Sequence, residues 1–453
     1  MKQIMALALV AAFILGSVSF ASAAELKVSG EFKSNAQWSS QFDLNDENNS
    51  EDEFNIRTRA RIIFRYSASD NLSAVLRIQY GTMYWGNPAT GGLIDTQSNS
   101  NIYLRRAYLE FKWPETSILF QAGKLSLALP NQFGSPIVGA DATAFVVSAP
   151  LTDMVSVAAG FARAVDLNPT DDGDSPNRDE WDHIFLAVPL TFDGLELTPY
   201  VNFSIQGDGV PVGVVSGTAT PNSILAAKDP LVEDLAYDDS YVYPWWAGLS
   251  MNLSMLDPFI LKGDFYWGMI SDGESETERK GWMADLELSY TGLDFMVPKL
   301  FGMYASGEDD DLDNGSERMP TIVDDWAMGT FWYGGSDLLD GDLDRTTTGT
   351  WTVGLGLTDI TFIEKLSHAL YVMYISGTND GELADTGALN FGSDLTADDY
   401  LVEIDFNHKY MIYEQLAAIV ELSYLINGYD EDKWDIADKS DAWKVGFGFN
   451  YNF

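Results

Sequence analysis

Apolar and polar side chains alternate strictly at the end of the chain. One face of this segment carries six apolar residues, five of them aromatic: Trp443, Val445, Phe447, Phe449, Tyr451 and Phe453. The residues between them are small or polar: Lys444, Gly446, Gly448, Asn450 and Asn452. Because successive side chains of a β-strand point to opposite faces, this period of two predicts a strand with one apolar face.

The same alternation recurs along the chain and predicts 18 strands. We expect them near residues 26–38, 54–66, 72–85, 102–113, 117–126, 142–149, 153–164, 181–192, 195–206, 241–254, 259–270, 280–291, 298–306, 348–358, 366–376, 399–410, 415–427 and 442–453. An even number suits a closed antiparallel barrel, and 16 strands remain possible if two of the weaker segments are loops. Short turns alternate with long polar stretches, of which 307–347 is the longest. The pattern therefore predicts an all-β fold, a transmembrane antiparallel β-barrel with short periplasmic turns, long acidic extracellular loops, lipid outside and water inside.

The beginning of the chain has the features of an export signal. Lys2 precedes an apolar run at residues 4–18, and Ala21-Ser22-Ala23 forms a small-residue cleavage site. We expect residues 1–23 to be a signal peptide and residues 24–453 to form a single barrel domain. No later run of about twenty apolar residues could form a membrane-spanning helix. The expected destination is the bacterial outer membrane, reached through the periplasm.

The chain is strongly acidic, with a formal net charge of −42. Nucleic-acid binding is excluded, because phosphate contacts need clustered Lys and Arg. Most acids fall in the expected loops, where solvation of an exposed surface explains them. Asp309, Asp311 and Asp313 have the odd spacing of a calcium loop, but Asn314 stands where that motif needs glycine. We expect no cofactor, with a loop-bound Ca²⁺ or Mg²⁺ as the open alternative.

Charged residues on the polar faces of the strands predict a pore with two unlike walls. Early strands carry Arg57, Arg59, Arg61, Arg65, Arg77 and Arg106, and later strands carry Asp264, Asp285, Glu287, Glu403, Asp405 and Glu421. An unpaired charge facing lipid costs roughly 2–4 kcal/mol near the midplane, so these faces should line water. The arrangement predicts a transverse field that orients hydrated solutes. The alternative is that the arginines pair with acids and brace the wall.

An enzymatic function is not expected. The three histidines, His183, His368 and His408, lack the paired spacing of a metal site. No nucleophile motif surrounds a serine, and the chain contains no cysteine.

The export signal, the alternating strands and the terminal Phe453 resemble those of general bacterial outer-membrane porins. Residues 105–112 (RRAYLEFK) and 121–125 (QAGKL) are similar to the fourth and fifth strands of that family. The whole chain looks closest to the homotrimeric porins of sulfate-reducing bacteria. The resemblance implies a homotrimer, which the small residues Gly30, Ser34 and Ala36 on the first strand would suit.

The resemblance also implies that the third loop, about 127–141, folds into the barrel as a constriction. This loop contains Phe133, Ile137 and a single acid, Asp141, so the acidic half of the family's constriction does not carry over. The family further implies an assembly signal at Phe449, Tyr451 and Phe453, with periplasmic chaperones and the barrel-assembly machinery as partners.

The sequence therefore predicts an outer-membrane porin. Its water-filled pore would let small hydrophilic solutes and ions diffuse passively past an arginine-lined wall facing acidic residues. Two alternatives stay open. One is a substrate-specific trimeric channel for a sugar or an anion, and the other is a structural or adhesive barrel whose loops carry its function.

Overall fold

The computed structural model describes most of the chain after residue 23. The described residues are 24–40, 42–45, 53–93, 102–166, 180–207, 241–270, 278–311, 314–322, 325–343, 345, 347–386, 389–436 and 438–453. The expected signal peptide lies outside them. Among the described residues, no helix has the length and apolar character needed to cross a membrane.

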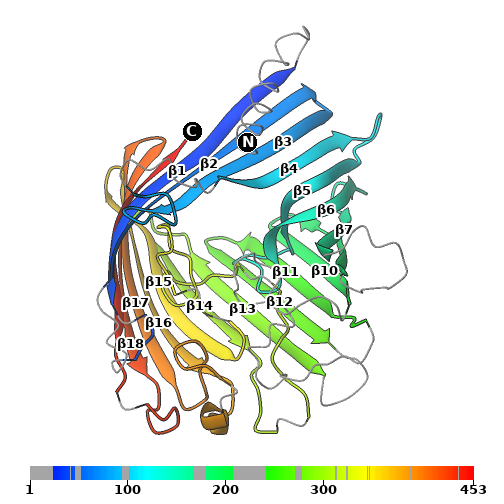
Figure 1. Cartoon of the computed structure of the whole chain (residues 1–453). Helices are drawn as coiled ribbons and strands as arrows, with labels where there is room; N and C mark the ends of the chain where they lie inside the picture. Colours follow the sequence, from blue (N-terminus) through cyan, green and yellow to red (C-terminus); the bar gives the residue numbers. More distant parts are fainter. Residues whose placement is uncertain are drawn as a thin grey trace.

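The described strands form one antiparallel sheet that closes on itself (Figure 1). They are β1 (Glu25–Ser40), β2 (Glu53–Ser69), β3 (Leu72–Tyr84), β4 (Ile102–Lys112), β5 (Leu119–Ala128), β6 (Gly139–Pro150), β7 (Ser156–Asp166), β8 (Glu180–Ala187), β9 (Leu190–Phe192), β10 (Leu195–Gln206), β11 (Trp245–Leu256), β12 (Phe259–Ile270), β13 (Arg279–Tyr290), β14 (Val297–Ala305), β15 (Thr350–Ile363), β16 (Leu366–Gly377), β17 (Tyr400–Tyr413), β18 (Leu416–Gly428) and β19 (Ala442–Asn452). The short 3-10 helix η5 (Gly381–Thr386) follows β16.

The sheet is a closed barrel of 18 strands, as the alternation predicted. β8 and β9 both pair with β10, so they are two parts of one strand that is interrupted at Pro189. Proline lacks the N–H that a sheet requires, which explains the interruption. The barrel closes where β1 pairs with β19, with Ala36 opposite Phe447. Closure leaves no sheet edge open for pairing with other chains.

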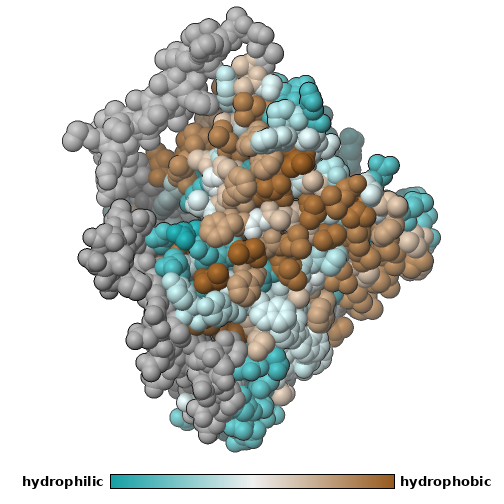
Figure 2. Space-filling view, turned by 90° about the vertical axis from the view of Figure 1, so that its right-hand side faces the viewer, coloured by the Kyte–Doolittle hydropathy of each residue, from teal (hydrophilic) through white to brown (hydrophobic). Residues whose placement is uncertain are grey.

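The outer surface of the barrel is apolar. In β19 the outward residues Val445, Phe447 and Phe449 are each about two-fifths exposed, while Gly446 and Gly448 between them are buried inside. Figure 2 shows apolar residues across the middle of one side, with hydrophilic residues concentrated above and below them. The period of two has therefore separated an apolar exterior from the interior.

The interior is more filled than the sequence led us to expect. Large apolar side chains of several strands, including Trp181, Trp246 and Tyr266, point inward and are almost fully buried. They belong to the same hydrophobic cluster as Phe331 and Trp332, which lie in the long connection between β14 and β15 (residues 306–349, the strap). A hydrophobic cluster thus occupies part of the barrel, and this cluster decides where a passage can lie.

Candidate functional site

A group of arginines on β2, β3 and β4 lines the inside of the barrel and forms what we call the basic wall. It consists of Arg59, Arg61, Arg77, Arg105 and Arg106. The strand register brings them together, because Arg61 pairs with Gln79 of β3 and Arg77 pairs with Arg106 of β4. Adjacent strands lie about 4.8 Å apart, so the guanidinium groups of successive strands are neighbours.

Glu31 of β1 lies at the centre of three of these arginines. Its Oε1 is 3.0 Å from Arg61 Nη1, 3.7 Å from Arg59 Nη2 and 4.0 Å from Arg77 Nη2. One carboxylate cannot neutralise three guanidinium groups, so the wall keeps an excess of positive charge. The three arginine side chains are 17–20% exposed, so they still face accessible space.

Asp141 holds the other two arginines of the basic wall. Its carboxylate lies 2.5 Å from Arg105 Nε and 2.7 Å from Arg106 Nε. Strict alternation places only one of these neighbours inside, and the sequence predicts only Arg106 there. A register shift between β3 and β4 at this point brings both to Asp141, since such an irregularity re-aims a side chain. The only sequence signal for Arg105 was its position next to Arg106.

Two of the predicted arginines, Arg57 and Arg65, hold neighbouring segments in place through hydrogen bonds. Arg65 Nη1 lies 2.8 Å from Glu110 Oε1 and 3.1 Å from Ser73 Oγ. Arg57 is nearly buried and donates from Nη1 to the backbone oxygens of Leu339 (2.8 Å) and Asp340 (2.7 Å). Both fit the alternative in which arginines brace the wall.

The strap passes next to the basic wall and brings two exposed acids there. The side chains of Asp337 and Asp340 are 53% and 51% exposed. Asp340 Oδ2 accepts a hydrogen bond from the Tyr84 hydroxyl (3.0 Å) and lies 3.8 Å from Arg57 Nε. Lys33 of β1 donates to the backbone oxygen of Asp337 (2.9 Å). The exposed acids beside the arginines therefore come mainly from the strap, and the sequence did not single them out.

The predicted acidic wall does not line water, and this part of the expectation is wrong. Asp264, Asp285, Glu287, Glu403, Asp405 and Glu421 are 5%, 4%, 9%, 0%, 0% and 1% exposed. They sit on inward faces as expected, but they are buried there, and all except Glu287 accept hydrogen bonds from an inward loop. Burying a carboxylate is costly unless it is paired or hydrogen-bonded, so its partners explain its position.

These acids anchor the strap to the barrel wall. Glu403 accepts hydrogen bonds from the backbone N–H groups of Phe331 (3.1 Å) and Trp332 (2.7 Å). Glu421 accepts from the backbone N–H of Asp337 (2.7 Å) and lies 2.9 Å from the fully buried ammonium of Lys444.

Two more of these acids contact the strap: Asp285 accepts from the Trp326 indole (2.8 Å), and Asp405 accepts from the backbone N–H of Thr330 (3.0 Å). Glu287 instead pairs with Lys299 of the neighbouring strand β14 (3.2 Å). Hydrogen bonds to buried carboxyl groups contribute about 0.5–3 kcal/mol each, so together they hold the strap firmly.

The third loop, residues 129–138 between β5 and β6, also lies inside the barrel. The backbone N–H of its Gln132 donates to Asp264 of β12 (2.7 Å). Phe133 O and Ile137 O accept hydrogen bonds from Ala327 N (2.9 Å) and Ile322 N (2.8 Å) of the strap. Ile137 is fully buried, whereas Asp141 lies not in the loop but in β6. The two inward loops thus support each other, and the apolar residues of the third loop pack against other parts of the protein.

The other predicted residues lie outside this interior. Phe449, Tyr451 and Phe453 face outward at the end of the chain, where Phe453 and Gly30 exchange two backbone hydrogen bonds (2.9 and 3.0 Å). Asp309 accepts from the backbone N–H of Asp311 (2.9 Å), and Asp313 lies outside the described residues. Among the described residues, the carboxylates that do converge are Glu308, Asp309 and Glu317, whose oxygens lie within 4.8 Å of one another.

Comparison with known proteins shows a likeness of fold. No protein-family model matches the chain, and a search of curated proteins found no match either. Among solved structures, OpdQ of Pseudomonas aeruginosa matches with a TM-score of 0.52 and 11% identity, covering 94% of this chain and 98% of that one. OccK11 (OpdR) of Pseudomonas aeruginosa has a TM-score of 0.51 and 9% identity, covering 94% and 96%. The outer membrane protein opdK from the same organism has a TM-score of 0.51 and 10% identity, covering 94% and 99%. At these identities the likeness supports the 18-stranded barrel fold and nothing finer.

Proposed function

We propose that this chain is a bacterial outer-membrane porin that lets small hydrophilic solutes and ions diffuse passively across the membrane. The observation that carries the proposal is the separation of surfaces: an apolar exterior encloses a wall of partly exposed arginines. An apolar belt on a closed barrel is stable in lipid, and the excess positive charge of five arginines that share two carboxylates on its inner face is stable only beside water. The similar fold of an outer membrane protein, opdK, supports the same location.

The passage would run along the basic wall. The hydrophobic cluster draws its buried strand residues from β7 onward and further residues from the two inward loops, whereas the arginines of β2–β4 lie outside it and retain exposed area. Solutes would pass between these arginines and the exposed acids Asp337 and Asp340 of the strap. Charges at a narrow point act at contact distance, so the arginines would serve as a local anion site. This passage requires no bound metal or cofactor.

The narrowing by the strap favours a second candidate, a channel selective for one class of solute such as a sugar or an anion. A lumen that is partly filled by packed side chains restricts solutes by size and orientation more strongly than an open one. We further propose a homotrimer, delivered by a cleaved signal peptide, periplasmic chaperones and the barrel-assembly machinery that reads the terminal aromatic residues.

Single-channel recording tests the proposal. The full mature chain, folded in detergent, is added to planar bilayers, and liposome swelling is measured with polyols and sugars of graded size. Ohmic conductance with permeation limited by solute size is the expected result for a general porin. Saturable block by one sugar or anion would favour the selective channel instead. Folded barrels that insert but pass neither ions nor solutes would overturn both and leave the structural or adhesive barrel. Chemical cross-linking in detergent would give a trimer band if the assembly proposal holds and only monomer if it fails.

A further inference from the structure

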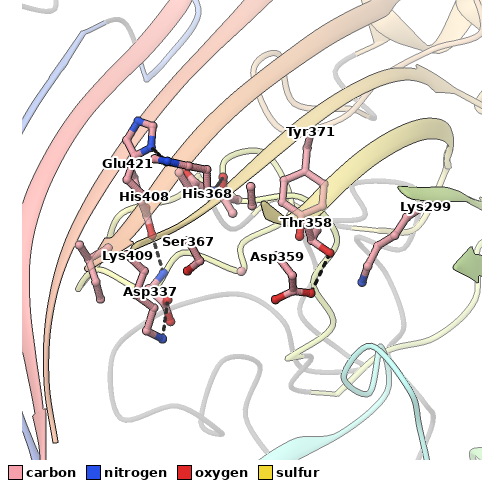
Figure 3. Close-up of a pocket in the computed structure, with 15 residues that line it drawn as sticks. Lys299, Asp337, Thr358, Asp359, Ser367, His368, Tyr371, His408, Lys409 and Glu421 are labelled. Atoms are coloured by element: carbon pink, nitrogen blue, oxygen red, sulfur yellow. Dashed lines mark hydrogen bonds and ion pairs between the residues drawn. The ribbon is translucent and has the colours of Figure 1, made fainter. Parts of the chain in front are cut away.

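A polar cavity of about 360 Å³ lies at the short-turn end of the barrel, beneath the strap. β14, β15, β16, β17 and β18 form its wall through residues near their short-turn ends, including Lys299, Thr358, Ser367, Lys409 and Glu421. Gly335 and Asp337 of the strap cover it. Figure 3 shows Lys299, Asp359 and Tyr371 on one side of the cavity and Ser367, Asp337 and Lys409 on the other. The volume is at the lower end of the about 300–1,000 Å³ typical of small-molecule sites.

An irregularity in β15 places a carboxylate in this cavity. The pairing of β15 with β16 shifts register between Leu357 and Ile360. Asp359 within the shift has a φ of 51°, in the left-handed region that few residues other than Gly, Asn and Asp adopt. Bulges of this kind commonly re-aim a side chain next to a functional site. The Thr358 hydroxyl lies 3.3 Å from Asp359 Oδ2 and orients the carboxylate.

The cavity presents hydrogen-bonding groups whose charges are largely balanced. Lys299 pairs with Glu287 (3.2 Å), Lys409 pairs with Asp337 (3.7 Å), and Glu421 pairs with Lys444 (2.9 Å). Asp359 forms no ion pair with any residue in the described part of the chain. A dianion would meet Asp359 without a free cation to offset it. A neutral ligand with many hydroxyl groups can donate to the carboxylates and accept from the ammonium groups.

One aromatic ring completes the lining. Tyr371 points inward from β16, and Figure 3 shows its ring next to Thr358 and Asp359. The face of such a ring packs well against the C–H groups of a sugar, while its hydroxyl remains available for hydrogen bonding. The cavity also lies close to the basic wall, because Asp337 contacts both Lys409 of β17 and Lys33 of β1, and Lys33 is the pairing partner of Arg59 in β2.

We propose that this cavity is a binding subsite for a neutral polyhydroxylated solute of monosaccharide or disaccharide size. Asp359 accepts hydrogen bonds from the solute's hydroxyl groups, and Lys409 donates to its oxygens. Tyr371 packs against its apolar face. The inference rests on the proposed channel function for its biological use, since the subsite would hold a solute on its way through the barrel. Binding itself needs only the folded barrel.

Equilibrium binding to the detergent-folded full chain tests the subsite. Maltose and glucose serve as the neutral probes, and glucuronate and glucosamine serve as charged probes, all followed by titration calorimetry. We expect saturable binding of at least one neutral probe. Asp359→Asn should weaken it about fivefold, because a neutral acceptor replaces a charged one. Asn tolerates the same φ as Asp, so the backbone of β15 is retained. Asp294→Asn, an exposed acid on the same rim outside the cavity, is the matched control and should leave binding unchanged.

A second variant separates the subsite from a general effect of charge. Tyr371→Leu should weaken binding about three- to tenfold through loss of the ring, with no change in charge. The absence of saturable binding by both neutral probes would overturn the proposal. Tighter binding of glucuronate than of glucose would also overturn it, and so would equal effects of Asp359→Asn and Asp294→Asn.

Channel recordings keep the two proposals apart. Ionic conductance without sugar binding would refute the subsite and leave the porin standing. Sugar binding by barrels that conduct no ions would support the subsite and refute the porin. If the barrel both conducts ions and binds sugar, sugar added on the short-turn side should block the current at a lower concentration than sugar added on the loop side, because the cavity lies near the short-turn end.

Discussion

Replacing Arg59 and Arg61 with serine tests whether the basic wall controls ions in the passage. Both side chains belong to β2 and share Glu31. The wall has five arginines against Glu31 and Asp141, so an excess of three positive charges falls to one. Their side chains are 18% and 20% exposed, so an ion in the passage could contact them directly.

The size of the effect follows from Coulomb's law. One unit charge at about 6 Å in water changes the energy of a monovalent ion by ~0.7 kcal/mol. Screening with a Debye length of about 8 Å reduces this to ~0.3 kcal/mol. Two lost charges therefore raise the energy of an anion at this point by ~0.7 kcal/mol, which lowers its local occupancy about threefold.

Reversal potentials in a salt gradient are the assay. The double variant should shift the reversal potential toward cation preference and change the conductance. A double variant Arg163→Ser and Lys280→Ser removes the same charge outside the basic wall, and it should leave the potential close to that of the unaltered chain. If Arg59→Ser and Arg61→Ser left both conductance and selectivity unchanged, the assignment of the passage to this wall would be refuted.

Three further predictions concern the strap and barrel closure. Lys444→Met removes the partner of buried Glu421 and two hydrogen bonds to strap carbonyls, so it should destabilise the folded state by about 3–5 kcal/mol in urea unfolding; an unchanged unfolding midpoint would contradict this role. Burial raises the pKa of the Tyr333 and Tyr429 hydroxyls, so the stability that they contribute should be complete below about pH 10 and be lost as the pH rises through the raised values. Ultraviolet titration should show at least two phenols ionising above the ordinary range, fewer by one in each of Tyr333→Phe and Tyr429→Phe; titration of every tyrosine near pH 10 would argue against their burial. Gly30→Ala should lower the yield of folded barrel in a heat-modifiability gel, because an added Cβ would lie 2.3 Å from the Arg61 carbonyl oxygen and 2.8 Å from the Phe453 ring. Folding at the normal yield would show that this close approach is not needed for barrel closure.

The barrel was predictable from the sequence because its signal is local. Each strand shows its own period of two, and the predicted 18 strands agree with the structure to within a few residues at most ends. The break at Pro189 left the count unchanged, because β8 and β9 continue one line of pairing with β10. The sign of the charge on each face could likewise be assigned from alternation alone.

Alternation could not predict which of those charges are buried and which are exposed to water. Alternation predicts that Glu403 and Arg61 are both inward-facing charged residues, yet Glu403 is fully buried under the strap and Arg61 is partly exposed. The difference depends on where a loop of more than forty residues folds back. Hydrogen bonds across 70 or more positions of sequence, such as Trp332 to Glu403, determine that path.

The sequence by itself determined a closed barrel with an apolar exterior and a charged interior, since strand periodicity and turn chemistry act between near neighbours. Only the tertiary structure decided which interior charges meet water. Two irregularities in strand pairing brought Arg105 and Asp359 to their positions, and the strap buried the acidic wall while carrying Asp337 and Asp340 to the arginines. These outcomes depend on contacts between distant segments, whose free energies no local pattern of residues encodes.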